Sequence, residues 1–340
     1  MRVLKLVYLL VGLALLGLLL WQADLGEVGT RLWQVGWWLL PICLIHFVAF
    51  MLDVWAWQFS LLAVRPGDAR WTYRLWKLRM AGEAYNNITP LASVGGEPLK
   101  AILLKSHYGI GFRDGIASLV LARTVILMGL LPFLAIGFVF VLQSPKLPQT
   151  YQVVAGAGLA AFTLAVLLFF AVQRYKVSSL AGTFLARGRL RHRIESVLHQ
   201  IREMEGRLIH FYTRHPRRVI GAVLFAFLNW AIGVIEIWVI MYAVGVPISW
   251  SDALIIEAMT QLVRAGVFFI PAGIGVQEGT FVLLCAALTG NPSVGLAVAG
   301  VRRVKELIWI VWGVALGWTY SMRPGDAARA AKRIERSKDM

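Results

Sequence analysis

Long apolar segments recur along this chain of 340 residues and constrain its fold more than any other feature. An α-helix needs about 20 consecutive apolar residues to cross a bilayer. Segments of roughly this length lie at residues 3–21, 37–62, 116–142, 151–172, 219–244 and 293–322. Hydrophobic residues make up 59% of the chain, which is more than soluble domains carry. The sequence therefore predicts an all-α, polytopic membrane helical bundle that forms a single transmembrane domain over residues 1–322, with an uncleaved first span.

Basic residues predict the orientation of this bundle. The chain has 34 Lys and Arg against 18 Asp and Glu, for a formal net charge of +16. The basic residues concentrate in the loop 65–79, the segment 173–218 and the tail 323–340. Because cytoplasmic loops carry such an excess, we expect both termini in the cytoplasm. The charge is then expected to meet anionic lipid rather than nucleic acid.

The segment 173–218 also carries apolar residues at helical spacing. They are Leu190, Ile194, Val197, Leu198, Ile201, Met204, Leu208 and Ile209. This pattern predicts an amphipathic helix. The helix either lies on the inner leaflet or packs on other cytoplasmic loops, and it can also serve as a hinge between two halves.

Two further regions, 80–105 and 253–290, are apolar but broken, and each contains a copy of one pattern. The copies run from Thr89 to Glu97 and from Ile270 to Glu278, with a proline, a turn of small residues, and a glutamate seven positions after the proline. The turn residues are Pro90, Gly95 and Gly96 in the first copy, and Pro271, Gly273 and Gly275 in the second. Irregular backbone survives at membrane depth only where it is buried in protein or lines a wet cavity. We therefore expect two re-entrant helical hairpins that enter from opposite faces, within inverted repeats over about residues 37–142 and 219–322.

Glu97 and Glu278 are the first candidate site residues. Each begins an apolar helix after a glycine-rich turn, so each carboxylate is expected near the positive end of a helix dipole. One interpretation is a helix cap. The other is a proton- or cation-linked carboxylate, or an anchor for a substrate, with the glycines allowing helix N-termini to approach an anion closely.

Arginines inside apolar spans are the second group of candidates. Arg123 lies 26 residues after Glu97, and Arg303, with its neighbour Arg302, lies 25 residues after Glu278. Charges at the bilayer centre are costly, so such residues usually face the interior and pair. They are expected either to form salt bridges with the two glutamates or to clamp a lipid phosphate, and the two arrangements can be successive states of one cycle.

Further polar residues are less specific. Arg264 and Glu83 hold matching positions, seven residues before Pro271 and Pro90, and are a candidate bridge between the halves. Asn86 and Asn87, before the first break, are expected to satisfy freed backbone groups or to touch a head group. His46 and Asp53 share one helical face, as do Asn229 and Glu236, and we interpret all four as residues that make hydrogen bonds in the bundle interior. Cys43 and Cys285 indicate neither a disulfide framework nor a metal site.

The stretch Thr89–Ala101 with Arg123 downstream, and Pro271–Gly279, resemble the two signature regions of the lysylphosphatidylglycerol synthase transmembrane, or flippase-like, family. The resemblance covers roughly residues 5–320 and extends to the stand-alone, hopanoid-associated branch. It implies a polytopic protein of the bacterial inner (cytoplasmic) membrane that moves lipids between leaflets. We expect no acyltransferase domain like that of the bifunctional members, so the resemblance does not imply aminoacyl transfer.

The leading hypothesis is a lipid flippase without enzymatic activity, metal or cofactor, whose partner is an anionic phospholipid or an isoprenoid- or hopanoid-type lipid. The sequence contains no metalloprotease, P-loop or nucleophile-elbow motif. One alternative is an intramembrane head-group transferase or hydrolase that uses Glu97 and Glu278 as acid and base. Another is a non-transporting partner of a lipid-synthesis complex. The sequence leaves both a monomer and a homo-oligomer open.

Overall fold

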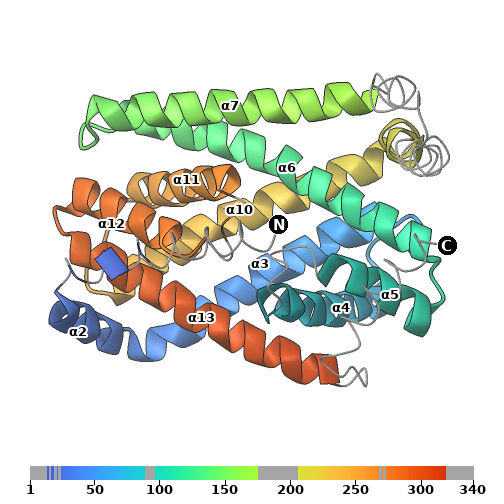
Figure 1. The fold of residues 1–340 in the computed structure, drawn as a ribbon, viewed down its shortest axis with the longest axis horizontal. Helices are drawn as coiled ribbons and strands as arrows, with labels where there is room; N and C mark the ends of the chain where they lie inside the picture. Colours follow the sequence, from blue (N-terminus) through green and yellow to red (C-terminus); the bar gives the residue numbers. More distant parts are fainter. Residues whose placement is uncertain are drawn as a thin grey trace, which may run out of the picture.

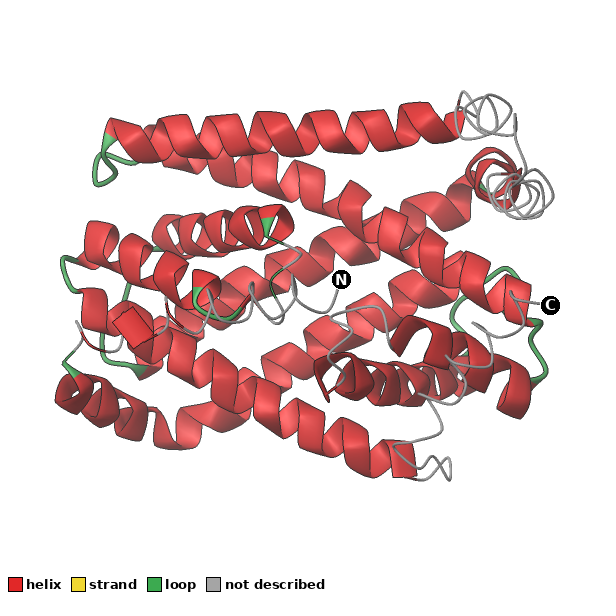
Figure 2. Ribbon diagram, viewed as in Figure 1, coloured by secondary structure: helices red, strands yellow, loops and turns green. Residues whose placement is uncertain are grey.

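The computed structural model describes residues 14, 17, 18, 21, 24–88, 96–174, 206–267, 270 and 273–318. These residues form helices and short connections, and no strand occurs among them (Figure 2). The predicted all-α bundle is therefore confirmed.

Helices of the first part of the chain are α2 (Leu25–Val35), the short 3₁₀ helix η1 (Gly36–Trp38), α3 (Leu39–Ser60), α4 (Ala69–Ile88), α5 (Gly96–Tyr108), α6 (Phe112–Gln143) and α7 (Gln149–Arg174). Those of the second part are α10 (Pro216–Ala243), α11 (Trp250–Gly266), α12 (Val276–Thr289) and α13 (Pro292–Trp318). Several of these helices begin or end at common capping residues. Asp24 and Ser249 cap the N-termini of α2 and α11 through their side chains, and Gly290 ends α12 in the left-handed conformation.

Most of the predicted spans match long apolar helices. Leu25–Ser60, Phe112–Gln143, Gln149–Ala171 and Pro216–Ala243 are long and apolar enough to cross a membrane. Helix α13 covers the last predicted span, but its charged residues exclude it from this purely apolar class. The predicted span 3–21 lies outside the described residues, apart from residues 14, 17, 18 and 21.

Two predicted connections are wrong. The region 22–36 is largely helix α2, which runs through η1 into α3. Most of the basic loop 65–79 is the first half of α4, where Leu75 and Leu78 are fully buried. Arg74 of that half lies over the rings of Trp71 and Tyr108, at 4.9 and 5.1 Å from their centroids. A basic residue there stabilises the helix surface by cation–π contact rather than marking a loop.

The order of elements in residues 39–143 recurs in residues 216–318: a long helix, a pair of shorter helices and another long helix. Helices α4 and α5 lie at one end of the long helices, and α11 and α12 lie at the other (Figure 1). Helix α3 packs along α10, while α4 packs on α13 and α11 packs on α6. Each pair of short helices thus packs against the last long helix of the other half.

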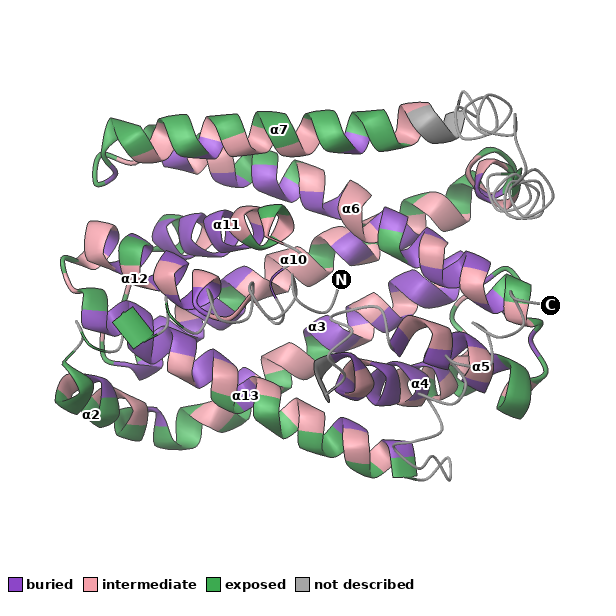
Figure 3. Ribbon diagram, viewed as in Figure 1, coloured by how far each residue is buried: buried purple, intermediate pink, exposed green. Residues whose placement is uncertain are grey.

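Small residues permit these crossings. A Cβ atom on Gly313 of α13 would lie 2.5 Å from the Met80 carbonyl oxygen of α4. A Cβ atom on Gly137 of α6 would lie 2.3 Å from the Ala258 Cβ of α11. Helix α7 lies outside this core and is largely exposed, as expected for a lipid-facing helix (Figure 3).

The predicted amphipathic segment lies mostly outside the described residues, which resume at residue 206. Residues 206–214 are helical, and Leu208 and Phe211 are buried against Leu121 of α6. This described end of the segment therefore packs on the bundle.

Candidate functional site

A charged cavity of about 330 Å³ lies among α3, α4, α6, α10, α11 and α13. As many carboxylates as basic side chains line it. The carboxylates are Asp53, Glu83, Glu236, Glu257 and Glu306, and the basic residues are Arg79, Arg123, Arg264, Arg302 and Lys305. Charged groups in a bundle of apolar helices are costly unless they are paired or line a wet pathway, and most of the charged side chains that line this cavity are paired.

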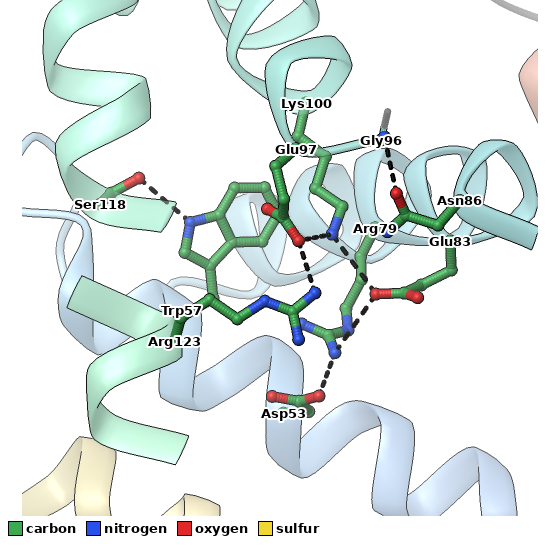
Figure 4. A network of polar contacts seen from close by, with 10 residues as sticks. All are labelled: Asp53, Trp57, Arg79, Glu83, Asn86, Gly96, Glu97, Lys100, Ser118 and Arg123. Atoms are coloured by element: carbon green, nitrogen blue, oxygen red, sulfur yellow. Dashed lines mark hydrogen bonds and ion pairs between the residues drawn. The ribbon is translucent and has the colours of Figure 1, made fainter. Parts of the chain in front are cut away.

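The first ion-pair cluster joins α3, α4, α5 and α6 (Figure 4). Glu97 accepts a hydrogen bond from Arg123 at 2.6 Å and lies 3.1 Å from the Lys100 ammonium group. Lys100 also lies 3.4 Å from Glu83, and Arg79 pairs with Asp53 and, at 3.7 Å, with Glu83. The salt bridge expected between Glu97 and Arg123 is therefore present.

Close contact between α4 and α5 places Lys100 in this cluster. A Cβ atom on Gly96 would lie 2.1 Å from the Gly82 carbonyl oxygen, and one on Gly82 would lie 2.3 Å from Lys100 Cε. The Gly96 backbone N–H donates to Asn86 Oδ1 at 2.7 Å, so Asn86 satisfies a freed backbone donor as expected. The Lys100 side chain can thus lie across α4, where it is 1% exposed.

We expect Gly96→Ala to destabilise the protein by about 1–3 kcal/mol, because the new methyl group overlaps backbone atoms that cannot rotate away. Thermal unfolding in detergent measures the change. Gly29→Ala in α2 is the matched control, since nothing lies within 4 Å of its Cβ position. Equal melting temperatures for the two variants would contradict the close helix contact.

The second ion-pair cluster joins α10, α11 and α13. Glu236 pairs with Lys305 and lies 3.5 Å from Arg302, while Glu257 pairs with Arg302 and accepts a hydrogen bond from Gln261 at 2.7 Å. All four charged side chains are at most 6% exposed. The Glu236 carboxylate also lies 3.4 Å from Nδ1 of His46. The interior hydrogen bonds expected for Asp53 and Glu236 are thus parts of ion pairs that cross between helices.

Glu278 lies in the first turn of α12, where it caps the helix and also pairs with an arginine. Its Oε2 accepts a hydrogen bond from the Gly275 backbone N–H at 2.8 Å, so it caps the helix. Its Oε1 lies 2.6 Å from Arg303, which also pairs with Glu306 at 2.8 Å. Gly275 has a φ of +80°, a conformation that favours glycine and lets the chain turn into α12.

Arg264, in the last turn of α11, lines the same cavity and belongs to neither network of ion pairs. Among the described residues, no carboxylate lies within ion-pairing distance of its guanidinium group. The candidate bridge between Arg264 and Glu83 is absent here, because Glu83 lies near Lys100 and Arg79 instead.

Some predicted residues cannot be placed. Pro90, Gly95, Pro271 and the side chain of Asn87 lie outside what the structure describes. Gly273 has a φ of +60° and belongs to the turn before α12.

Sequence reasoning missed Lys100 and Glu257 and assigned Arg79 to a loop. Their signals were nevertheless in the sequence, because Glu257 is a carboxylate inside an apolar run and Lys100 follows Glu97 by one helical turn. Arg302 and Arg303, predicted to act together, point to different carboxylates. Within the described residues, no group of three or more His, Cys, Asp or Glu side chains is placed to hold a metal ion.

Comparison with known proteins confirms the resemblance. The family described as the lysylphosphatidylglycerol synthase TM region matches residues 5–313. A UPF0104 membrane protein of Methanothermobacter thermautotrophicus is 21% identical over 289 residues, which cover 80% of this chain and 81% of the relative. A second protein of that name and organism is 27% identical over 293 residues (78% and 79%), and one of Pyrococcus horikoshii is 24% identical over 242 residues (66% and 70%). No solved structure matches the chain.

Proposed function

The chain belongs to the lysylphosphatidylglycerol synthase transmembrane family of multi-pass membrane proteins, and from this premise we propose that it is a flippase that moves a phosphate-bearing lipid between leaflets. The single observation that carries the proposal is the charged cavity, lined by helices of both halves. Ionisable groups inside a membrane domain mark the path of a polar substrate more often than they stabilise the fold.

A phosphate head group fits the chemistry of this cavity. Guanidinium groups bind phosphate oxygens through paired hydrogen bonds. Arg264 has no carboxylate partner among the described residues, so it can accept an anion without breaking an ion pair. Arg123 is half exposed, and its bond to Glu97 is the pair most open to exchange.

Glu97 and Glu278 allow the transport cycle to bind and release the phosphate head group. When a phosphate takes the place of a carboxylate beside Arg123 or Arg303, Glu97 and Glu278 retain Lys100 and the Gly275 N–H as partners. When the phosphate leaves, each carboxylate pairs again with its arginine. Each exchange leaves the arginine paired with an anion, so no guanidinium group is buried without a counter-charge.

The position of the helix pairs supports alternating access. The pairs α4–α5 and α11–α12 lie at opposite ends of the long helices (Figure 1). We propose that they are inverted re-entrant hairpins of two repeats, about 37–142 and 219–322, that open the cavity to one leaflet at a time. Both termini are then cytoplasmic, and the membrane is the inner, or cytoplasmic, membrane.

Leaflet exchange in reconstituted vesicles tests this function. Purified protein is expected to accelerate the exchange of a labelled phospholipid, with the lipids chemically unchanged by mass spectrometry. Exchange at the protein-free rate for several lipid classes would contradict the proposed lipid transport. A new lipid product that disappears in Glu97→Gln would favour the intramembrane enzyme instead, and retained co-purification with lipid-synthesis proteins without any exchange would favour the non-transporting partner.

A further inference from the structure

An apolar groove lies beside the charged cavity, on the outer surface of the same helices. Its lining includes Phe47, Met51 and Trp55 of α3, Tyr73 and Trp76 of α4, and Trp312 of α13. Helices α3, α4 and α13 also line the cavity. The groove measures about 550 Å³, which is enough for apolar chains.

A cluster of aromatic rings separates the groove from the cavity. The Trp312 ring lies 5.6 Å from both Trp76 and Trp309 and 6.4 Å from Phe47, measured between centroids. Trp309 lines the cavity, and its ring packs edge-on against the His46 ring, with 4.7 Å between the two centroids. His46 in turn contacts Glu236, so the aromatic cluster connects directly to the second ion-pair cluster.

Two donors at this boundary lack acceptors. The indole N–H groups of Trp76 and Trp309 are buried, and neither has a hydrogen-bond partner in the described structure. Buried donors without partners cost free energy and are rare in folded proteins. Where they occur together between a charged cavity and an apolar groove, they match a ligand that changes from polar to apolar at that point.

We propose that the groove binds the acyl chains of an ester-linked lipid whose head group occupies the cavity, with its ester carbonyls accepting hydrogen bonds from Trp76 and Trp309. The inference rests on the proposed lipid transport and adds the binding site for the apolar part of the substrate. Both indole N–H groups are buried, so Trp312, which is 38% exposed and contacts both rings, moves aside when they donate to the ligand.

Photolabelling tests the site. The protein is reconstituted in vesicles of phosphatidylethanolamine and phosphatidylglycerol that contain a trace of phosphatidylglycerol with a diazirine on one chain, linked by an ester in one probe and by an ether in the other. Adducts on groove residues are counted relative to adducts on the exposed face of α7, which reports ordinary lipid contact. We expect the ester probe to give a higher ratio than the ether probe.

Trp76→Phe and Trp309→Phe keep an aromatic ring but remove the donor. Each is expected to lower the ratio for the ester probe by about fivefold, as for the loss of one hydrogen bond, and to leave the ether probe unchanged. Trp33→Phe, at an exposed tryptophan of α2 outside the groove, is the matched control. Thermal unfolding verifies that all three variants remain folded.

Equal labelling by both probes in the unmodified protein, or no loss in either folded groove variant, would overturn the site. The outcome is separable from that of the transport proposal, because photolabelling reports occupancy at equilibrium. Ester-selective labelling without leaflet exchange would refute transport and keep the site. Leaflet exchange without ester-selective labelling would refute the site and keep the transport proposal.

Discussion

Glu236→Gln is expected to destabilise the protein by about 3–5 kcal/mol, which is the loss typical when one partner of a buried ion pair is removed. Lys305 is 4% exposed, and Glu236 is the one carboxylate within ion-pairing distance of it among the described residues. The substitution leaves this ammonium group buried without a counter-charge. Unfolding in detergent by heat or denaturant measures the effect.

Two variants control this prediction. Glu306→Gln also removes a carboxylate beside a base of α13, but Arg303 keeps Glu278, and Glu306 is 34% exposed. Its effect is expected to stay below about 1 kcal/mol. The double variant Glu236→Gln with Lys305→Met removes both charges and is expected to recover much of the stability. A Glu236→Gln variant as stable as Glu306→Gln would show that Lys305 finds another partner or water.

Arg264→Gln is expected to slow leaflet exchange of a phosphate-bearing lipid by about tenfold to a hundredfold, while the protein keeps its stability. The range corresponds to the loss of charge-assisted hydrogen bonds to one phosphate. Stability is retained because the guanidinium group supports no ion pair among the described residues. Exchange of a fluorescent phospholipid in vesicles, beside thermal unfolding, measures both quantities.

Arg65→Gln makes the same chemical change in the loop between α3 and α4, at a residue that does not line the cavity, and is expected to leave exchange unchanged. Equal rates for Arg264→Gln and Arg65→Gln would remove Arg264 from the substrate path. A loss of exchange accompanied by unfolding would assign Arg264 to the fold instead.

Much of the bundle could be predicted because apolar length alone determines a membrane span. Predicted spans 37–62 and 219–244 differ from α3 and α10 by a few residues at their ends. The first half of helix α4 was missed because basic residues at 70–79 were counted as a loop. Its helical periodicity is hidden from hydropathy, since its buried side includes Arg79 as well as leucines.

The site was partly predictable for a different reason. Offsets of 26 and 25 residues in two copies of one pattern indicated the pairs Glu97–Arg123 and Glu278–Arg303 without any structure. The pairs around Glu236 and Glu257 have no such repetition. Lys305 and Glu236 are 69 residues apart, and only the crossing of α10 and α13 determines which carboxylate each base meets.

The central claim is that one charged cavity opens in turn to the two sides of the membrane. Ala49 lies on α3 in the cavity wall and can be replaced by cysteine in a background with Cys43→Ala and Cys285→Ala. Ala63→Cys and Ser144→Cys, in connections at opposite ends of the bundle, serve as controls for each side (Figure 1). With a membrane-impermeant maleimide, we predict that Ala49→Cys reacts from both sides and each control from one side only. Reaction of Ala49→Cys from a single side, or from neither, while both controls react, would contradict the alternating cavity.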